Sequence, residues 1–149
     1  MNRRARGFTL IELAVVLLIV GLALGLVGPS IGRATDTIRA RADVAAVAAF
    51  LRHAREQAIA KREVHRVQVD PDGQGLLLTS GDSETVKASR EVRSSTRLAR
   101  EPRDASAVTF LPEGRSSGGA FLVEGAGRLL YRVRVDPLSG RVSNRRVES

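Results

Sequence analysis

The sequence predicts an α+β protein in which one long N-terminal helix packs on antiparallel β-sheet. Three observations indicate this fold class. Residues 13–32 contain no charged side chain, residues 33–62 continue with the apolar spacing of a helix, and from residue 63 apolar residues alternate with period two between turn sequences. The length of 149 residues allows one domain with an appendage.

Composition excludes several classes of function. The absence of cysteine excludes a disulfide framework, a cysteine-ligated zinc site, an iron–sulfur cluster and thiol catalysis. With only His53 and His65, a multi-histidine metal centre is not expected either. The net charge is +8, and its basic part consists of 22 Arg and two Lys. We therefore expect no metal and no cofactor.

The uncharged block 13–32 has the length of a membrane span. Twenty residues at about 1.5 Å each match a hydrocarbon core of about 30 Å. Arg3, Arg4 and Arg6 precede the block, so the N-terminus is expected to stay cytoplasmic while the C-terminal part is exported. A cleaved signal peptide is the alternative, although no Ala-x-Ala site follows the block.

Glu12 distinguishes these two interpretations. A carboxylate costs about 2.5–3.5 kcal/mol at the bilayer centre and less near the interface, and a signal peptide gains nothing from it. Cleavage after Gly7 would create an α-amino group on Phe8. In a packed assembly, this amine of one subunit can meet Glu12 of the next, so Glu12 is a candidate assembly residue.

The sequence RGFTLIEL at 6–13, followed by the apolar run, resembles the class III leader of type IV pilins and type II secretion pseudopilins. The resemblance implies that a prepilin peptidase cuts after Gly7 and methylates the new N-terminal Phe8. It also implies an assembly role for Glu12 and a helix break at Pro29, which is physically a weak point of a helix.

The resemblance also implies a type IV pilin-like fold, a domain plan and a location. The expected parts are a leader (1–7), a transmembrane and assembly helix (8–32), an amphipathic continuation (33–62) and a periplasmic antiparallel β domain (63–149). The chain would be a single-pass protein of the bacterial inner membrane that later enters a pseudopilus. Its partners would be other pilins or pseudopilins in a hetero-oligomeric filament, the prepilin peptidase, the inner-membrane assembly platform and membrane lipid.

Residues 33–62 show one narrow apolar helical face. The face consists of Val44, Val47, Leu51, Ala54 and Ala58. Packing against the sheet is the favoured interpretation, and an amphipathic helix on a membrane surface is the alternative. Two i,i+4 charge pairs, Arg39 with Asp43 and Arg52 with Glu56, are expected at exposed positions.

The remaining sequence predicts short strands separated by turns. The expected strands are 66–69, 76–78, 107–110, 120–123, 128–135 and 141–143, with turns at 70–73, 112–114, 124–127 and 136–140. In 128–135, Arg128, Arg132 and Arg134 should face away from the apolar side. Residues 79–106 are rich in Ser, Arg and Glu and are predicted to be irregular, with one edge strand as the alternative.

A second resemblance lies near the C-terminus. The sequences FLPEGRSSGG at 110–119 and VDPLSGR at 135–141 are similar to the GspH/FimT group of minor pilins. The run Ser116–Gly119 is predicted to be a tight structural loop rather than a phosphate cradle, because no GK[ST] follows it. No catalytic motif surrounds His53 or His65, where His65 is expected to be half-buried in a strand, so we expect no enzyme activity.

Two functions are compatible with these features. The first is an H-type minor pseudopilin of the type II secretion system, at or near the tip of the periplasmic pseudopilus that drives folded proteins across the outer membrane. The alternative is a FimT-like minor type IV pilin in pilus biogenesis or DNA capture, with Arg141, Arg145 and Arg146 contacting nucleic acid. Loss of three leader arginines lowers the net charge from +8 to +5, and no aromatic residue in the tail can stack on bases, which weakens the alternative.

Overall fold

The computed structural model describes the backbone of residues 8–81, 85–102, 107–126 and 129–147, and within 26–34 it describes the backbone alone. The expected leader 1–7, including Gly7, lies outside the described residues, as does Arg128. The chain divides into two units, Met1–Thr35 and Asp36–Ser149. Each unit is described by itself below.

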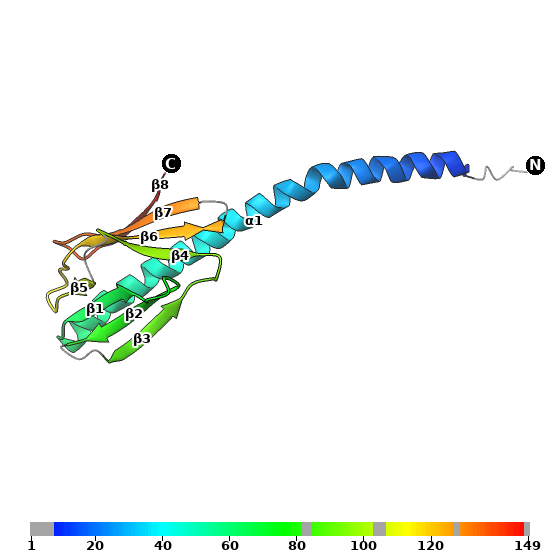
Figure 1. The fold of residues 1–149 in the computed structure, drawn as a ribbon. Helices are drawn as coiled ribbons and strands as arrows, with labels where there is room; N and C mark the ends of the chain where they lie inside the picture. Colours follow the sequence, from blue (N-terminus) through cyan, green and yellow to red (C-terminus); the bar gives the residue numbers. More distant parts are fainter. Residues whose placement is uncertain (1–7, 82–84, 103–106, 127–128, 148–149) are drawn as a thin grey trace, which may run out of the picture. The chain divides into compact units, whose positions relative to one another are not determined.

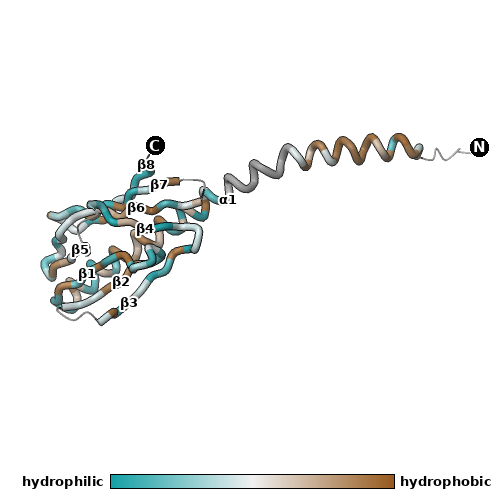
Figure 2. The backbone as a smooth tube through the Cα atoms, in the orientation of Figure 1, coloured by the Kyte–Doolittle hydropathy of each residue, from teal (hydrophilic) through white to brown (hydrophobic). Residues whose placement is uncertain are grey.

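The N-terminal unit contains the start of the long helix α1 (Leu10–Lys61). Thr9 caps this helix: its Oγ1 accepts a hydrogen bond from the Glu12 backbone N–H at 3.3 Å, and its carbonyl oxygen accepts one from Leu13 N at 3.2 Å. The first described turns of α1 are mostly apolar (Figure 2). Within the part of the chain that the structure describes, no helix is both long and apolar enough to cross a membrane. The predicted span 8–32 extends into residues 26–32, whose side chains are outside that part.

The backbone of α1 remains helical at Pro29. The helix break that the resemblance implies there is therefore absent from the structure. Proline removes one i→i−4 hydrogen bond, but the neighbouring residues keep theirs, so a long helix can continue through a single proline.

The second unit consists of the C-terminal part of α1 and two antiparallel four-stranded sheets (Figure 1). The first sheet has the order β3-β2-β1-β5 and the second has the order β4-β6-β7-β8. The strands of the first sheet are β1 (His65–Val69), β2 (Gly75–Ser80), β3 (Val86–Glu91) and β5 (Val108–Phe110). The strands of the second are β4 (Arg97–Glu101), β6 (Gly119–Gly125), β7 (Leu129–Val135) and β8 (Val142–Val147).

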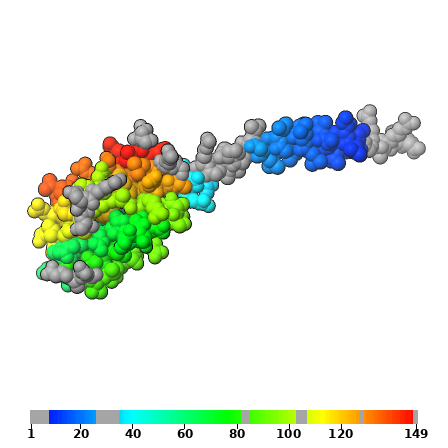
Figure 3. Space-filling model, in the orientation of Figure 1, coloured from blue at the N-terminus to red at the C-terminus, as the bar shows by residue number. Residues whose placement is uncertain are grey.

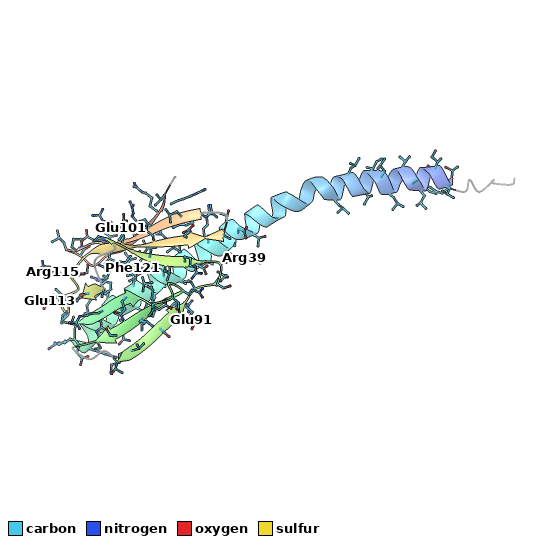
Figure 4. All side chains as sticks on the ribbon, viewed as in Figure 1. Arg39, Glu91, Glu101, Glu113, Arg115 and Phe121 are labelled. Carbon is cyan, nitrogen blue, oxygen red and sulfur yellow. The ribbon has the colours of Figure 1, made fainter. Side chains whose placement is uncertain are left out.

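The predicted apolar face of the helix is buried in the core between the two sheets. Val47, Leu51 and Ala54 are fully buried, and the core also includes Val67 of β1 and Val133 of β7. Phe121 of β6 is fully buried and points into this core (Figure 4). The alternative of a membrane-surface helix is therefore wrong for this segment, because its apolar face packs on the protein's own sheets.

The prediction for residues 79–106 is wrong, because this region contributes two strands, β3 and β4. Each lies at the edge of its sheet, where one neighbouring strand is enough to define it. β3 is almost entirely exposed, so no apolar alternation marks it. In β4, Leu98 and Arg100 point inward, and the buried Arg100 conceals the pattern that would otherwise indicate a strand.

The expected exposed pair of Arg39 and Asp43 does not form. Asp43 is only 6% exposed and forms an ion pair with Arg93, whereas Arg39 lies 4.0 Å from Asp36. An i,i+4 pair on a helix surface is worth only about 0.2–0.5 kcal/mol, so a partner from another part of the fold readily replaces it. Arg52 and Glu56 are exposed, as predicted.

Candidate functional site

The described start of the chain presents a helix surface on which apolar side chains and one carboxylate are exposed. Phe8 is 80% exposed, and Glu12 is exposed one turn further on. The large apolar side chains exposed from here to Leu24 are Leu10, Ile11, Leu13, Val15, Val16, Leu17, Leu18, Ile19, Val20, Leu22 and Leu24. A contiguous apolar surface of this kind marks a contact with lipid or with other helices. The site predicted around Phe8 and Glu12 thus lies on an exposed helix surface.

Thr9 is a residue of this site that sequence reasoning missed. It occupies the N-cap position of α1, and Glu12 is the third residue of the helix. The sequence Thr9-Leu10-Ile11-Glu12 has the T-x-x-E spacing of a capping box, which could have indicated this helix start. The cap ties the Glu12 backbone to Thr9 and so orients the first turn that carries the carboxylate.

The two C-terminal motif segments, 110–119 and 135–141, meet at Ser116. Its backbone N–H donates to the Pro137 carbonyl at 3.1 Å, and its Oγ donates to the Asp136 carbonyl at 2.9 Å. The same Oγ accepts a hydrogen bond from Gly118 N at 3.0 Å. These bonds confirm the prediction of a structural loop, since the polar groups of Ser116 are bound to backbone groups of the loop and of the neighbouring 135–141 segment.

Asp136 organises the turn that follows β7. Its Oδ1 accepts hydrogen bonds from Ser139 N at 2.8 Å, Ser139 Oγ at 2.8 Å and Leu138 N at 3.1 Å. The backbone and hydroxyl of Ser139 lower the pKa of this carboxyl below 3.8, and Leu138 N and the charge of Arg134 add to the shift. The turn predicted at 136–140 is confirmed, with an ionised aspartate at its centre.

Arg55 of α1 connects the helix to both motif segments. Its Nε donates to the Gly114 carbonyl at 3.0 Å. Gly140 has a φ of 63°, and a Cβ at this position would overlap the Gly114 carbonyl oxygen and approach Arg55 Nε to 2.8 Å. The close approach of these turns therefore requires glycine. Next to them is a hollow of about 250 Å³, lined by Arg52, Arg55, Glu56, Gly140, Arg141 and Val142.

The three arginines of the nucleic-acid alternative are not in one place. Arg141 borders the hollow beside Arg55, whereas Arg145 and Arg146 border a different hollow of about 290 Å³ next to Arg41. Arg132 and Arg134 of β7 face outward as predicted, and they line a third hollow of about 310 Å³ with Arg145.

Neither histidine lines one of these three hollows. His65 is buried rather than half-buried, and its Nδ1 donates to the Glu63 carbonyl at 3.1 Å. His53 is exposed on α1, with Nε2 at 3.4 Å from Gln57 Nε2. Among the residues that the structure describes, no three His, Asp or Glu side chains are grouped as metal ligands would be.

Comparisons with known proteins agree with this geometry. The family described as "Type II transport protein GspH" matches residues 43–139, and the "Prokaryotic N-terminal methylation motif" matches residues 2–28. A curated relative, type II secretion system protein H of Xanthomonas campestris pv. campestris, is 32% identical over 120 residues, which are 80% of this chain and 71% of that protein.

Solved structures of low sequence identity share the fold. The type IV minor pilin FimU of Pseudomonas aeruginosa matches with a TM-score of 0.59 and 17% identity, covering 79% of this chain and 96% of that one. The minor pseudopilin EpsH of Vibrio cholerae matches with a TM-score of 0.57 and 14% identity, covering 74% of this chain and 96% of that one.

The fold and the N-terminal motif define the class of pilin-like subunits, with one long helix and antiparallel sheets. Within this class, the chain belongs to the GspH family of type II transport proteins. Membership of this family implies assembly with other pilin-type subunits in a filament.

Proposed function

We propose that the chain is a non-enzymatic subunit at or near the tip of the periplasmic pseudopilus, where it helps to drive folded proteins across the outer membrane. The subunit would reside in the inner membrane with its N-terminus cytoplasmic and residues 63–149 periplasmic. The prepilin peptidase would remove residues 1–7 and methylate Phe8, and the inner-membrane assembly platform would pass the subunit from lipid into the filament.

The observation that carries this proposal is the exposed apolar start of α1 with Glu12 in its first turn. An apolar helix surface can move from lipid to neighbouring helices with little change in solvation, so it suits a subunit that is stored in a membrane and then assembled. A carboxylate on that surface lacks water in both environments and requires a cation. The α-amino group of a processed Phe8 on the neighbouring subunit is a cation of suitable size and charge.

The test is replacement of Glu12 by Ala in the full chain, with Glu56→Ala as the matched control on the same helix. Glu56 is also exposed but lies in the second unit, beside Arg52 and Arg55. We expect Glu12→Ala to insert in the inner membrane at normal abundance and to be depleted from sheared or cross-linked pseudopili. Normal incorporation of Glu12→Ala would show that the ion-pair argument is wrong.

The second candidate function, DNA capture by a minor type IV pilin, is favoured by Arg41, Arg145 and Arg146 around one hollow. Contacts from these side chains to phosphates would give sequence-independent affinity that decreases with salt. A gel shift of the detergent-solubilised full chain with duplex DNA at low and high salt tests this function. Absence of a gel shift at low salt would exclude DNA capture as the function.

A further inference from the structure

β8 is the edge strand of the second sheet. It pairs with β7 from Leu130↔Val147 to Val135↔Val142, and no described strand pairs with its other side. In the space-filling view, the residues of β8 (red) lie at the surface beside those of β7 (Figure 3). An edge strand presents unpaired backbone N–H and C=O groups, which can accept an additional strand from another chain.

One face beside this edge is lined by guanidinium groups. Arg145 of β8 is directly opposite Arg132 of β7, and Ser143 is opposite Arg134. Like charges directly opposite each other on neighbouring strands are destabilising. Glu101 of β4 (labelled in Figure 4) balances Arg132, with its Oε2 2.7 Å from Arg132 Nε. Among the described residues, no acidic side chain forms an ion pair with Arg145.

The opposite face of the strand carries a second basic group. Arg146 is opposite the buried Tyr131, so it projects to the same side of the sheet as that residue, and its own side chain is exposed. There it lines a hollow with Arg41 of α1, whose wall also includes Val44, Tyr131, Asn144 and the neighbouring Arg145. The described linings of this hollow and of the hollow around Arg132, Arg134 and Arg145 contain no acidic side chain.

We propose that the β8 edge binds an extended acidic segment of a neighbouring pseudopilin by strand addition. This inference rests on the proposed function, because it requires the chain to lie in a filament. In an added strand, successive side chains point to opposite faces, and those on one face repeat about every 6.6–6.8 Å. Acidic side chains at successive positions would therefore reach Arg145 on one face and Arg146 with Arg41 on the other.

The same surface fits a peptide better than a nucleic acid. Tyr131, the aromatic side chain at the hollow beside Arg146, is buried, so it offers no exposed ring on which a base could stack. The unpaired backbone of β8 supplies alternating donors and acceptors, which match the backbone of an extended peptide. A phosphate chain has acceptors but no N–H donors, so it would leave the β8 carbonyl groups without partners.

The inference is tested by photo-cross-linking of the full chain in its native host. A photoreactive amino acid replaces Ser143, which is exposed on β8, and a second strain carries it at Val16 of α1. Mass spectrometry then identifies the segment attached to each position. The Val16 position reports incorporation into the filament independently of the β8 edge.

Charge reversal shows whether the arginines are responsible. Arg145→Glu with Arg146→Glu is compared with Lys87→Glu with Arg90→Glu, which makes the same charge change on the exposed edge strand β3 of the other sheet. A milder pair, Arg145→Gln with Arg146→Gln, removes the charges without reversal. Resistance of each variant to limited proteolysis verifies folding.

We expect Ser143 to cross-link to a pseudopilin segment with at least two acidic residues among about six. The yield should fall about tenfold in the β8 glutamate variant, detectably in the glutamine variant and not in the β3 control. A non-acidic segment, a nucleic acid, no product at Ser143 or an unchanged yield in the β8 variants overturns the inference. If Val16 still cross-links to pseudopilins in that case, the proposed function stands. If neither position cross-links to a pseudopilin, the inference about β8 and the proposed function are both overturned.

Discussion

The carboxylate of Asp43 in α1 accepts a hydrogen bond from Thr96 Oγ1 at 2.6 Å, across 53 residues of sequence. Thr96 is 1% exposed, and Arg93 forms an ion pair with the same carboxylate. One acidic side chain of the helix thus holds the connection between β3 and β4, which belong to different sheets. Because this connection links a strand of each sheet, the contact with Asp43 ties both sheets to α1.

Asp43→Ala should therefore lower the free energy of unfolding by about 1.5–3 kcal/mol, because it leaves the Thr96 hydroxyl buried without its acceptor and removes a charged partner. Glu56→Ala, at an exposed position on the same helix, should change it by less than about 0.5 kcal/mol. Both changes are measured by urea unfolding of the full chain in detergent, with the resistance of the second unit to trypsin as the readout of folding. Equal losses would contradict a specific role for Asp43.

Gly140→Ala tests the contact between the two C-terminal turns. The added Cβ would overlap the Gly114 carbonyl oxygen at a φ of 63°. Gly81→Ala is the matched control, because Gly81 has a φ of 64° but nothing within 4 Å of the added atom. The control should lower the free energy of unfolding by about 1 kcal/mol from backbone strain alone. Gly140→Ala should lower it by at least about 2 kcal/mol. Similar thermal unfolding midpoints for the two variants would show that the close approach contributes nothing.

The Asp136 turn predicts a pH dependence of stability. The pKa of this carboxyl is lowered in the folded state by the hydrogen bonds from Ser139, so its ionised form favours folding. That contribution to stability is complete well above pH 3.8, the ordinary pKa of the group. It is lost as the pH falls through the lowered pKa of the folded state. Asp136→Asn retains an acceptor oxygen but not the charge. Its stability deficit relative to the parent should therefore be larger at pH 7 than at pH 3, as measured by urea midpoints, and a deficit that is independent of pH would contradict the assignment.

Replacement of Gly7 by a bulky residue should block removal of the leader. The peptidase must accommodate the residue before the cut, and a large side chain there would prevent cleavage. We expect the mature chain to gain the mass of residues 1–7 in intact-mass spectrometry and to lose N-methylation of Phe8. Gly21→Ala, in α1 with nothing within 4 Å of the added Cβ, serves as the control and should be processed normally. A processed Gly7 variant would show that cleavage does not occur after this residue.

The sequence predicted those parts of the fold that depend on local periodicity. The helical face of Val44, Val47 and Leu51 is buried as expected, and Tyr131, Val133 and Val135 point inward from β7. These patterns are visible because burial on one side of an element selects apolar residues at the period of that element. The N-terminal motif at 6–13 and the C-terminal motifs at 110–119 and 135–141 likewise indicated the family that the comparisons show.

The sequence did not predict elements whose inward residues are polar or whose faces are mostly exposed. β3 has almost no buried side chain, and β4 buries Arg100, whose guanidinium carbon lies 5.8 Å from the centre of the Phe121 ring. Asp43 was assigned to the surface because a carboxylate on a helix is usually solvated. Only a partner 53 residues away makes its burial favourable.

By itself, the sequence determined the long helix, its apolar face, most strands and the membership of a pilin-like family, since each follows from local spacing or from a short linear motif. The tertiary structure alone decided the division into two sheets, the contact of Ser116 with Pro137 and the separation of Arg141 from Arg145. These features depend on which distant segments become neighbours. Strand order and turn contacts are set by packing around α1, and no periodicity within a single segment encodes them.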